Sequence, residues 1–290
     1  MHYTFKNVLG EFILDEKLNI VNKKVKDSKP LPQEKLPKVL EIFKDKKYFQ
    51  QFYQENFKLT KKSIKNSVTE DQLITQAISN INELDKTSNL LSKRLREWYS
   101  LYLPEFSEQL SHNEKFVELA ATKTREELMK EFGITDSMGA DLENLHVDEI
   151  ILLAKEIITL YSLRKNHEEY LQKVMKKYCP NLLELAGATI GAKLIELAKS
   201  LKRLAMLPAS TVQLLGAEKA LFRHIKTGSR SPKYGVIINH PIIQNAKKDE
   251  KGKSSRVLAD KLSLCARLDF FKGEFKAPEY KKELEEKFKQ

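Results

Sequence analysis

Cysteine, glycine and proline are all scarce in this sequence, with 2, 10 and 9 copies in 290 residues. Cys179 and Cys265 lie far apart and form no CxxC pair, which argues against a disulfide framework or a zinc site. The shortage of glycine and proline argues against a turn-rich all-β fold. No uncharged apolar stretch of about 18 residues occurs, and residues 1–10 contain no apolar run with a cleavage site. We therefore expect a mainly helical, soluble, intracellular protein without a membrane partner.

Recognisable motifs for catalysis and cofactor binding are also missing. No GxGxxG occurs, and the six histidines show neither HxxxH nor HExxH spacing. Gly252-Lys253-Ser254 matches the end of a phosphate-binding P-loop, but the first glycine of that motif would fall on Lys247. The carboxylates are spaced as on solvated helix faces. We predict no catalytic residue, no metal and no cofactor, although a catalytic triad scattered along the chain would leave no motif.

The positive charge of the chain is concentrated in one segment. Lysine and arginine number 51 and aspartate and glutamate 40, a net charge of +11. Residues 1–192 contain 29 of each sign, residues 193–276 contain 18 basic and 7 acidic residues, and the tail from 277 contains 4 of each. Phosphate backbones are the commonest partner of such a cluster, because each neutralised phosphate releases a counterion. Solubility charge and an anionic membrane surface are the alternatives.

The first 70 residues have a mixed pattern. Short runs of β-branched and aromatic residues at 7–13 and 18–25 predict a hairpin or paired strands. Residues 36–43 and 48–57 predict short helices. We expect a small α/β domain over residues 1–70.

A heptad pattern begins at Asp71. Its nine positions are spaced alternately 3 and 4 residues apart: Ile74, Ala77, Ile81, Leu84, Ser88, Leu91, Leu95, Trp98 and Tyr102. This period predicts a coiled-coil seam, which Pro104 ends. A second long helix begins near Val147 and ends at Cys179-Pro180. We predict an antiparallel hairpin of 71–103 against 146–178, within a coiled-coil domain of residues 71–178.

The second helix has more apolar positions than one seam needs, because Val147, Ile151 and Ile158 form a second stripe. This favours dimerisation through the hairpin, while an ordinary hairpin packed on its own domain is the alternative. The residues assigned to dimerisation are Ile150, Ala154, Ile157, Ile158 and Tyr161.

Residues 179–290 predict a basic helical domain. Lys219, Arg223 and Lys226 have i, i+4, i+7 spacing, so one helical face carries three cations while Leu221, Phe222 and Ile225 can face the core. A basic loop at 227–235 and a basic cluster at 247–256 follow. The predicted RNA contacts are Lys219, Arg223, His224, Lys226, Arg230, Lys233, Asn239, His240, Lys251, Lys253 and Arg256, and ordinary solvated charge is the alternative for each.

Several stretches resemble the Nop-domain proteins. They are residues 206–224, which include Gly-Ala-Glu-Lys at 216–219 and Ala-Leu-Phe-Arg at 220–223, residues 251–269, residues 95–99 with 103–105, and residues 137–142. The resemblance covers about residues 70–275. It implies a small N-terminal α/β domain, a long antiparallel coiled-coil hairpin and a C-terminal helical Nop domain.

The archaeal members that the chain resembles are non-catalytic scaffolds of box C/D guide ribonucleoproteins, which methylate ribose 2′-hydroxyls of RNA. The resemblance implies a fibrillarin methyltransferase bound to the N-terminal domain, a homodimer through the coiled coil, and a guide RNA bound together with a kink-turn-binding, ribosomal-protein-like subunit. It places the interface with RNA or that subunit at Gln213, Gly216, Ala217 and Glu218. It also implies a cytoplasmic location in an archaeal cell.

Three alternatives remain at this stage. One is a spliceosomal Nop-domain protein that binds another kink-turn. The second is an RNA-modifying enzyme in its own right, which would bind a methyl donor. The third is a structural coiled-coil protein with incidental basic charge.

Overall fold

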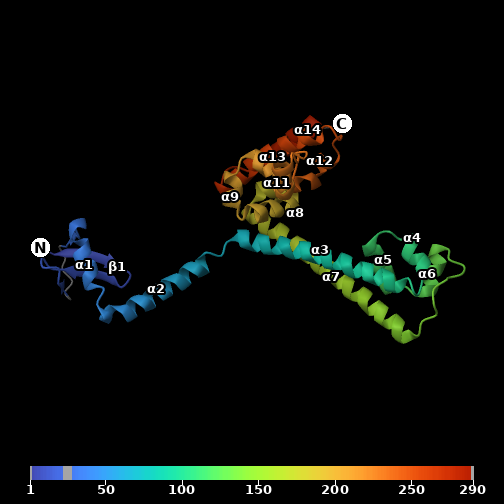
Figure 1. Ribbon diagram of the computed structural model, residues 1–290, viewed down its shortest axis with the longest axis horizontal. Helices are drawn as coiled ribbons and strands as arrows, with labels where there is room; N and C mark the ends of the chain where they lie inside the picture. Colours follow the sequence, from blue (N-terminus) through green and yellow to red (C-terminus); the bar gives the residue numbers. More distant parts are fainter. Residues whose placement is uncertain (1, 22–27, 289–290) are drawn as a thin grey trace. The chain divides into compact units, whose positions relative to one another are not determined.

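The computed structural model describes residues 2–21 and 28–288, and the chain divides into two compact units, residues 1–69 and 70–290 (Figure 1). The mainly helical fold class is confirmed. The further division at residue 178 stays a prediction, because one hydrophobic core joins Ile74 and Met175 of the hairpin to Leu182 and Leu262 of the C-terminal helices.

The first unit contains a four-stranded sheet in the order β3-β2-β1-β4. Its strands are β1 (Tyr3–Asn7), β2 (Gly10–Leu14), β3 (Ile20–Val21) and β4 (Lys29–Pro30). β1 and β2 form an antiparallel hairpin in which Tyr3 pairs with Leu14, and β4 runs parallel to β1. A short 3-10 turn (Gln33–Lys35), α1 (Leu36–Ile42) and α2 (Lys46–Asn66) follow.

The predicted first strand at 7–13 was wrong in its bounds. Asn7 ends β1, its side-chain oxygen accepts a hydrogen bond from the Leu9 amide at 2.9 Å, and the chain turns before Gly10. The strand within the predicted segment is therefore β2 (Gly10–Leu14), preceded by the turn that follows β1. β3 lies inside the predicted strand at 18–25, whose residues 22–25 lie outside the described residues.

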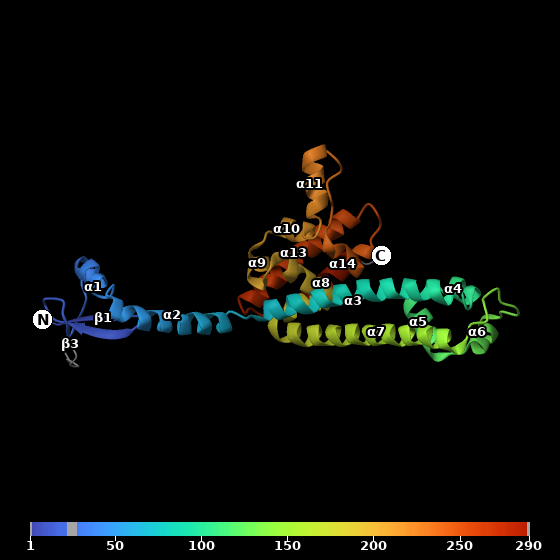
Figure 2. The ribbon, with the colours of Figure 1, turned by 60° about the horizontal axis from the view of Figure 1, so that its bottom comes forward.

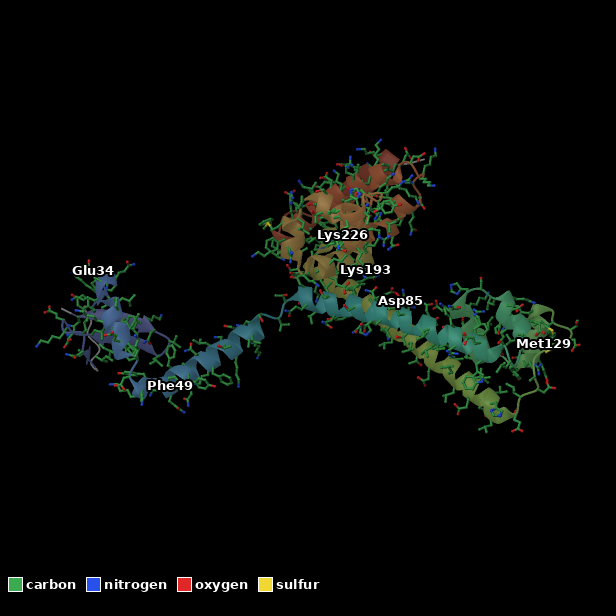
Figure 3. All side chains as sticks on the ribbon, viewed as in Figure 1. Glu34, Phe49, Asp85, Met129, Lys193 and Lys226 are labelled. Carbon is green, nitrogen blue, oxygen red and sulfur yellow. The ribbon has the colours of Figure 1, made fainter. Side chains whose placement is uncertain are left out.

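The second unit is built on a hairpin of two long helices, α3 (Glu70–Tyr99) and α7 (Asn144–Tyr178), which lie side by side (Figure 2). Ser92 Oγ and Tyr161 Oη lie 3.0 Å apart across it. Asp85, labelled in Figure 3, pairs with Arg164. These two contacts between α3 and α7 fit an antiparallel arrangement, because the later residue of α3 meets the earlier residue of α7.

The predicted seam is buried at Ile74, Ala77, Ile81 and Leu95, but Trp98 is 37% exposed and the neighbouring Tyr99 is 2% exposed. An undistorted helix drifts by about 20° per heptad relative to a 3.5-residue repeat, so four heptads shift the buried position by nearly one residue.

Three short helices cap the far end of the hairpin: α4 (Pro104–Gln109), α5 (Asn113–Thr122) and α6 (Arg125–Phe132). They enclose a second core, in which Phe106 and Phe116 stack at 4.9 Å. Pro104 occupies the first turn of α4, where its missing amide hydrogen needs no partner.

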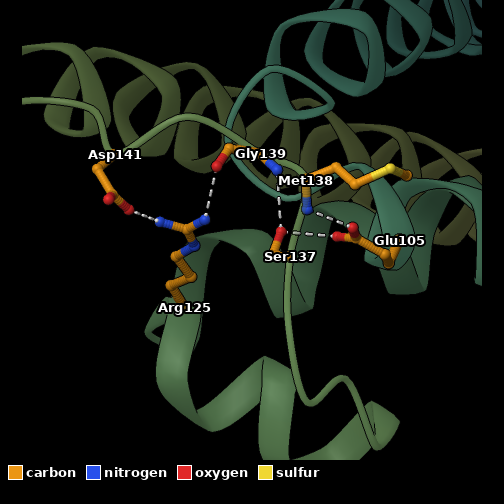
Figure 4. Close-up of polar contacts among 6 residues, drawn as sticks. All are labelled: Glu105, Arg125, Ser137, Met138, Gly139 and Asp141. Atoms are coloured by element: carbon orange, nitrogen blue, oxygen red, sulfur yellow. Dashed lines mark hydrogen bonds and ion pairs between the residues drawn. The ribbon is translucent and has the colours of Figure 1, made fainter.

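Figure 4 shows how the loop after α6 is fixed. Glu105 accepts hydrogen bonds from Ser137 Oγ and from the Met138 amide, both at 2.8 Å, and the bond from Met138 is the main cause of a lowered pKa of Glu105. Arg125 donates to the Gly139 carbonyl at 3.0 Å and pairs with Asp141. Two stretches that were far apart in the resemblance, 103–105 and 137–142, are therefore in direct contact.

The C-terminal helices are α8 (Pro180–Ala198), α9 (Leu201–Met206), α10 (Ala209–Leu214), α11 (Glu218–Thr227), α12 (Pro241–Gln244), α13 (Lys251–Phe270) and α14 (Ala277–Phe288). The apolar run 236–238 belongs to a 3-10 turn (Val236–Asn239), and its Ile237 is buried. α8 is kinked at Gly187, whose φ is +74°. α13 lies at the centre of this part and packs on α8, α9 and α10.

A buried polar junction joins α8, α13 and α14. The Asp269 carboxylate of α13 accepts hydrogen bonds from the backbone amides of Asn181 and Leu182 at 3.0 and 2.8 Å, at the start of α8. The Asn181 side-chain oxygen accepts from the amides of Lys276 and Ala277 at 2.8 and 3.0 Å, at the start of α14. Burial raises the pKa of Asp269, and the hydrogen bonds that its carboxylate accepts from Leu182 and Asn181 oppose that rise.

Candidate nucleic-acid interface

α11 is the least covered helix of the second unit. It has no buried residue, and Figure 2 shows it projecting from the other helices of that unit. The prediction that Phe222 and Ile225 face the core was wrong, because their side chains are 67% and 69% exposed. The pattern of Leu221, Phe222 and Ile225 showed only that the helix is amphipathic. It carried no information on whether another element covers the apolar side.

The turn before α11 is held by tight backbone approaches. Gly216 has a φ of +87°, which favours glycine, and its amide donates to Glu218 Oε1 at 2.8 Å. A Cβ atom at Gly235 would lie 1.9 Å from the Leu215 carbonyl oxygen, so only glycine fits there.

Gln213, in the segment before α11, holds the segment that follows α11 by two hydrogen bonds. Its carbonyl accepts from the Gly235 amide at 2.8 Å, and its side-chain amide donates to the Lys233 carbonyl at 2.6 Å. The predicted interface residues Gln213, Gly216 and Glu218 thus shape the base of α11. Their contact with RNA or a protein subunit stays a prediction.

The three predicted cations of α11, Lys219, Arg223 and Lys226, are exposed. Figure 3 labels Lys226 on α11 and Lys193 on α8. None of the three forms an ion pair with a residue in the described ranges. Their charges are therefore free to act on an anionic partner.

The loop after α11 brings two predicted basic segments together. His224 is half-buried and its Nδ1 contacts the Ser229 carbonyl. Arg230 and Lys233 are exposed, and a Cβ atom at Gly252 would lie 3.5 Å from Lys233 Cδ. The 227–235 loop therefore meets the start of α13.

The remaining predicted contacts on this side differ in exposure. Lys253 and Asn239 are exposed, and Lys251 is partly buried. Arg256 is exposed and lines a cleft between α13 and α14 with Asp260 and Glu283. All four stay in the predicted set.

His240 does not fit the predicted set, because it is 8% exposed. Its Nε2 lies 2.9 Å from the Leu185 carbonyl, and its Nδ1 accepts from the Ile242 amide at 3.3 Å as the N-cap of α12. Burial lowers the pKa of His240, which favours the neutral ring. Both nitrogens are occupied inside the protein, so the predicted RNA contact of His240 is contradicted.

Sequence reasoning missed Lys193 as a site residue. It lines a cleft of about 330 Å³ together with Asn82, Glu196, Gly216 and Gly235, next to the turn that carries α11. Its charge was counted within the basic segment, but its position beside Gly216 depends on how α8 packs against that turn.

Three of the five predicted dimerisation residues are also misplaced. Ile150, Ala154 and Ile157 are at most 1% exposed and belong to the second core of the same chain. Ile158 and Tyr161 are partly buried against that core. Ile150, Ala154 and Ile157 face α3 and α5, so they cannot also face another copy.

A different apolar stripe of α7 is open. Leu145, Leu152, Leu163 and Tyr170 are 68%, 51%, 43% and 43% exposed. They follow one another at intervals of 7, 11 and 7 residues, so at about 100° per residue they lie within about 20° of one line along the helix. It is not the second stripe expected from the sequence, because Val147, Ile151 and Ile158 are partly buried.

In the part of the chain that the structure describes, no group of three or more His, Cys, Asp or Glu side chains could hold a metal ion. No helix there is both long and apolar enough to span a bilayer.

These features define a class: a helical protein with a long hairpin and a body that exposes unpaired cations. The Nop family profile, described as "snoRNA binding domain, fibrillarin", matches residues 80–290. An uncharacterized NOP5 family protein of Methanocaldococcus jannaschii is 43% identical over 243 residues, which cover 78% of this chain and 58% of that protein. The chain belongs to the Nop family.

Eukaryotic relatives match as well. Nucleolar protein 56 and nucleolar protein 58 of Schizosaccharomyces pombe are 39% and 37% identical, over 69% of this chain and 45% and 42% of theirs. The chain thus spans less than two thirds of these relatives. A solved structure titled "Crystal structure of fibrillarin/Nop5p complex" aligns with 99% of this chain and 100% of that chain, at 25% identity and a TM-score of 0.48.

Proposed function

We propose that this chain is a non-catalytic scaffold of a box C/D guide ribonucleoprotein, which joins a fibrillarin methyltransferase to guide RNA for 2′-O-ribose methylation. The observation that carries the proposal is the exposed, unpaired set of Lys219, Arg223 and Lys226 on α11. This helix lies inside the segment that matches a snoRNA-binding domain.

The RNA surface in this proposal begins at α11 and continues through Arg230 and Lys233 to Lys251 and Lys253, because the loop after α11 meets the start of α13. Cations on a rigid helical frame position a phosphate backbone, while arginine adds two-point contact to phosphate. Asn239, His224 and Arg256 border this surface, and His240 is left out.

The protein partners are assigned by position. Fibrillarin is proposed for the first unit because that unit, residues 1–69, lies outside residues 80–290, the range that matches the Nop profile. The kink-turn-binding subunit is proposed at the turn formed by Gln213, Gly216, Ala217 and Glu218. The archaeal relative supports assembly in the cytoplasm of an archaeal cell.

The proposal is tested by reconstitution. Fibrillarin, the kink-turn-binding subunit, a box C/D guide RNA and a labelled methyl donor are combined with and without this chain. Methyl transfer to the guided ribose is expected only with the chain present, and the chain alone is expected to bind no methyl donor. A chain that binds neither the RNA–subunit complex nor fibrillarin overturns the proposal. Methyl transfer by the chain alone would establish an enzyme instead.

We further propose that the scaffold dimerises through the open stripe of α7. Replacing Leu152 and Leu163 by glutamine is expected to convert a dimer into a monomer in sedimentation equilibrium. Both side chains are about half exposed in the single chain. Replacing them by glutamine therefore removes apolar surface that would be buried mainly in the dimer contact. The helical circular dichroism signal is expected to stay unchanged.

The matched control is Leu59→Gln on α2, a half-exposed leucine of the first unit. It is expected to leave the dimer intact. A double variant that still sediments as a dimer, or a wild-type chain that is monomeric at tens of micromolar, contradicts the assignment.

A further inference from the structure

The basic charge of this chain is not confined to its last third. The first unit, residues 1–69, contains 15 basic and 8 acidic residues, a balance of +7, while residues 70–192 contain 14 and 21, a balance of −7. The two values cancel, so the zero balance over residues 1–192 concealed a second basic region. Most of it lies in α2, which carries six lysines and one glutamate in 21 residues.

Five of the six lysines of α2 share one face, and Lys46 lies outside it. At about 100° per residue, Lys47, Lys58, Lys61, Lys62 and Lys65 fall within an arc of about 100°. Phe49, Phe52 and Tyr53 occupy an arc of similar width on the opposite side. We call the first set the lysine face of α2.

The lysine face is open to solvent. α2 has no buried residue, and its described contact with the rest of the first unit is at its start, where the Tyr48 ring lies 5.1 Å from that of Phe43. Figure 3 labels Phe49 near that start. No side chain of the lysine face is therefore used to hold the fold of the unit.

Three of the five lysines of this face have no carboxylate partner within the described residues, whereas Lys47 pairs with Asp45 at 3.6 Å at the start of the helix. Lys58 pairs with Glu55 at 2.7 Å while remaining 69% exposed, and Lys61 Nζ lies 4.4 Å above the Phe57 ring. Lys62 and Lys65 form no ion pair within the described residues. A cluster of like charges on adjacent turns repels itself, so a polyanion that neutralises it gains affinity.

We infer that the lysine face of α2 is a second RNA-binding surface, which takes the phosphate backbone of the bound RNA without reading its sequence. Lysine is a compact point charge that contacts phosphate without the two-point geometry of arginine, and this face contains no arginine. The inference rests on the proposed function for the presence of RNA, but α2 lies outside residues 80–290, the range that matches the family.

The test uses the full chain with its kink-turn-binding subunit and a box C/D guide RNA. In one variant, Lys58, Lys61, Lys62 and Lys65 are replaced by glutamine, a residue of similar helix propensity. Affinity is measured by fluorescence anisotropy across salt concentrations. Each lost phosphate contact reduces the slope of log affinity against log salt by about 0.7 to 0.9, so the slope is expected to fall by about 3. The affinity at 0.1 M salt is expected to fall at least ~30-fold on the same basis.

Two controls accompany it. Arginine at the same four positions is expected to preserve both slope and affinity. Replacing Lys86, Lys93, Lys155 and Lys165 by glutamine removes the same charge from exposed positions of α3 and α7 and is expected to leave the slope unchanged. An equal loss in this hairpin variant would show a general charge effect and overturn the inference.

The outcomes separate the inference from the proposed function. A wild-type complex that binds RNA, combined with an unchanged slope in the α2 variant, overturns the inference and leaves the proposed function standing. No RNA binding by the wild-type complex overturns the proposed function. If the α2 variant keeps its RNA slope but loses fibrillarin, the lysine face is a protein contact and the inference is wrong.

Discussion

Replacing Asn181 by alanine is expected to lower the free energy of unfolding of the second unit by about 3 kcal/mol. The side chain is 2% exposed and makes four hydrogen bonds that join three helices. Alanine would leave the amides of Lys276 and Ala277 and part of the Asp269 carboxylate unpaired in the interior. Buried unpaired polar groups cost their full desolvation, which is why the effect exceeds that of an ordinary hydrogen bond.

Guanidinium unfolding followed by circular dichroism measures this effect. Asn166→Ala, at an exposed position of α7, is the matched control and is expected to change the free energy of unfolding by less than about 0.5 kcal/mol. A loss below about 1 kcal/mol for Asn181→Ala would mean that α8, α13 and α14 are held together without this junction.

Replacing Lys219, Arg223 and Lys226 together by glutamine is expected to weaken guide RNA binding by ~100-fold at 0.1 M salt and to reduce the salt slope by about 2 to 3. The three side chains are exposed and form no described ion pair, so the fold does not depend on them. Loss of RNA affinity would therefore not be a consequence of unfolding.

The same anisotropy titration, with the kink-turn-binding subunit present, measures this loss. Glutamine at Lys155, Lys165 and Lys173 of α7 removes equal charge elsewhere and is expected to change little. An α11 variant that keeps its affinity and slope would exclude this face and move the RNA surface to the loop and the start of α13.

The sequence predicted the long helices closely. α3 ends at Tyr99 and α7 spans Asn144–Tyr178, against predicted segments of 71–103 and 146–178. Heptad periodicity, Pro104 and Pro180 are local signals, and a helix of eight or more turns contains enough of them to be read without its neighbours. The first strand was misplaced because one short apolar run fits either a single strand or a turn between two.

Most site predictions depended on information that is not local. The cations of α11 are where the spacing of the residues placed them, since a helical face follows directly from sequence separation. Whether a face is covered depends on other elements, and for that reason Phe222 is exposed and Ile150 is buried. His240 was predicted to contact RNA, yet its ring caps α12 inside the body.

The sequence by itself determined the helical class, the approximate bounds of the two hairpin helices and the sign and position of the charge, because each depends on residues close together along the chain. The tertiary structure decided that α7 leaves open the stripe of Leu152 and Leu163. It also decided which polar groups are enclosed at Asn181 and Asp269, and that the 227–235 loop meets α13. These depend on contacts between residues that are far apart in the sequence. The free energy gained by burying an apolar side chain depends on which other elements pack over it, and the local sequence does not contain that information.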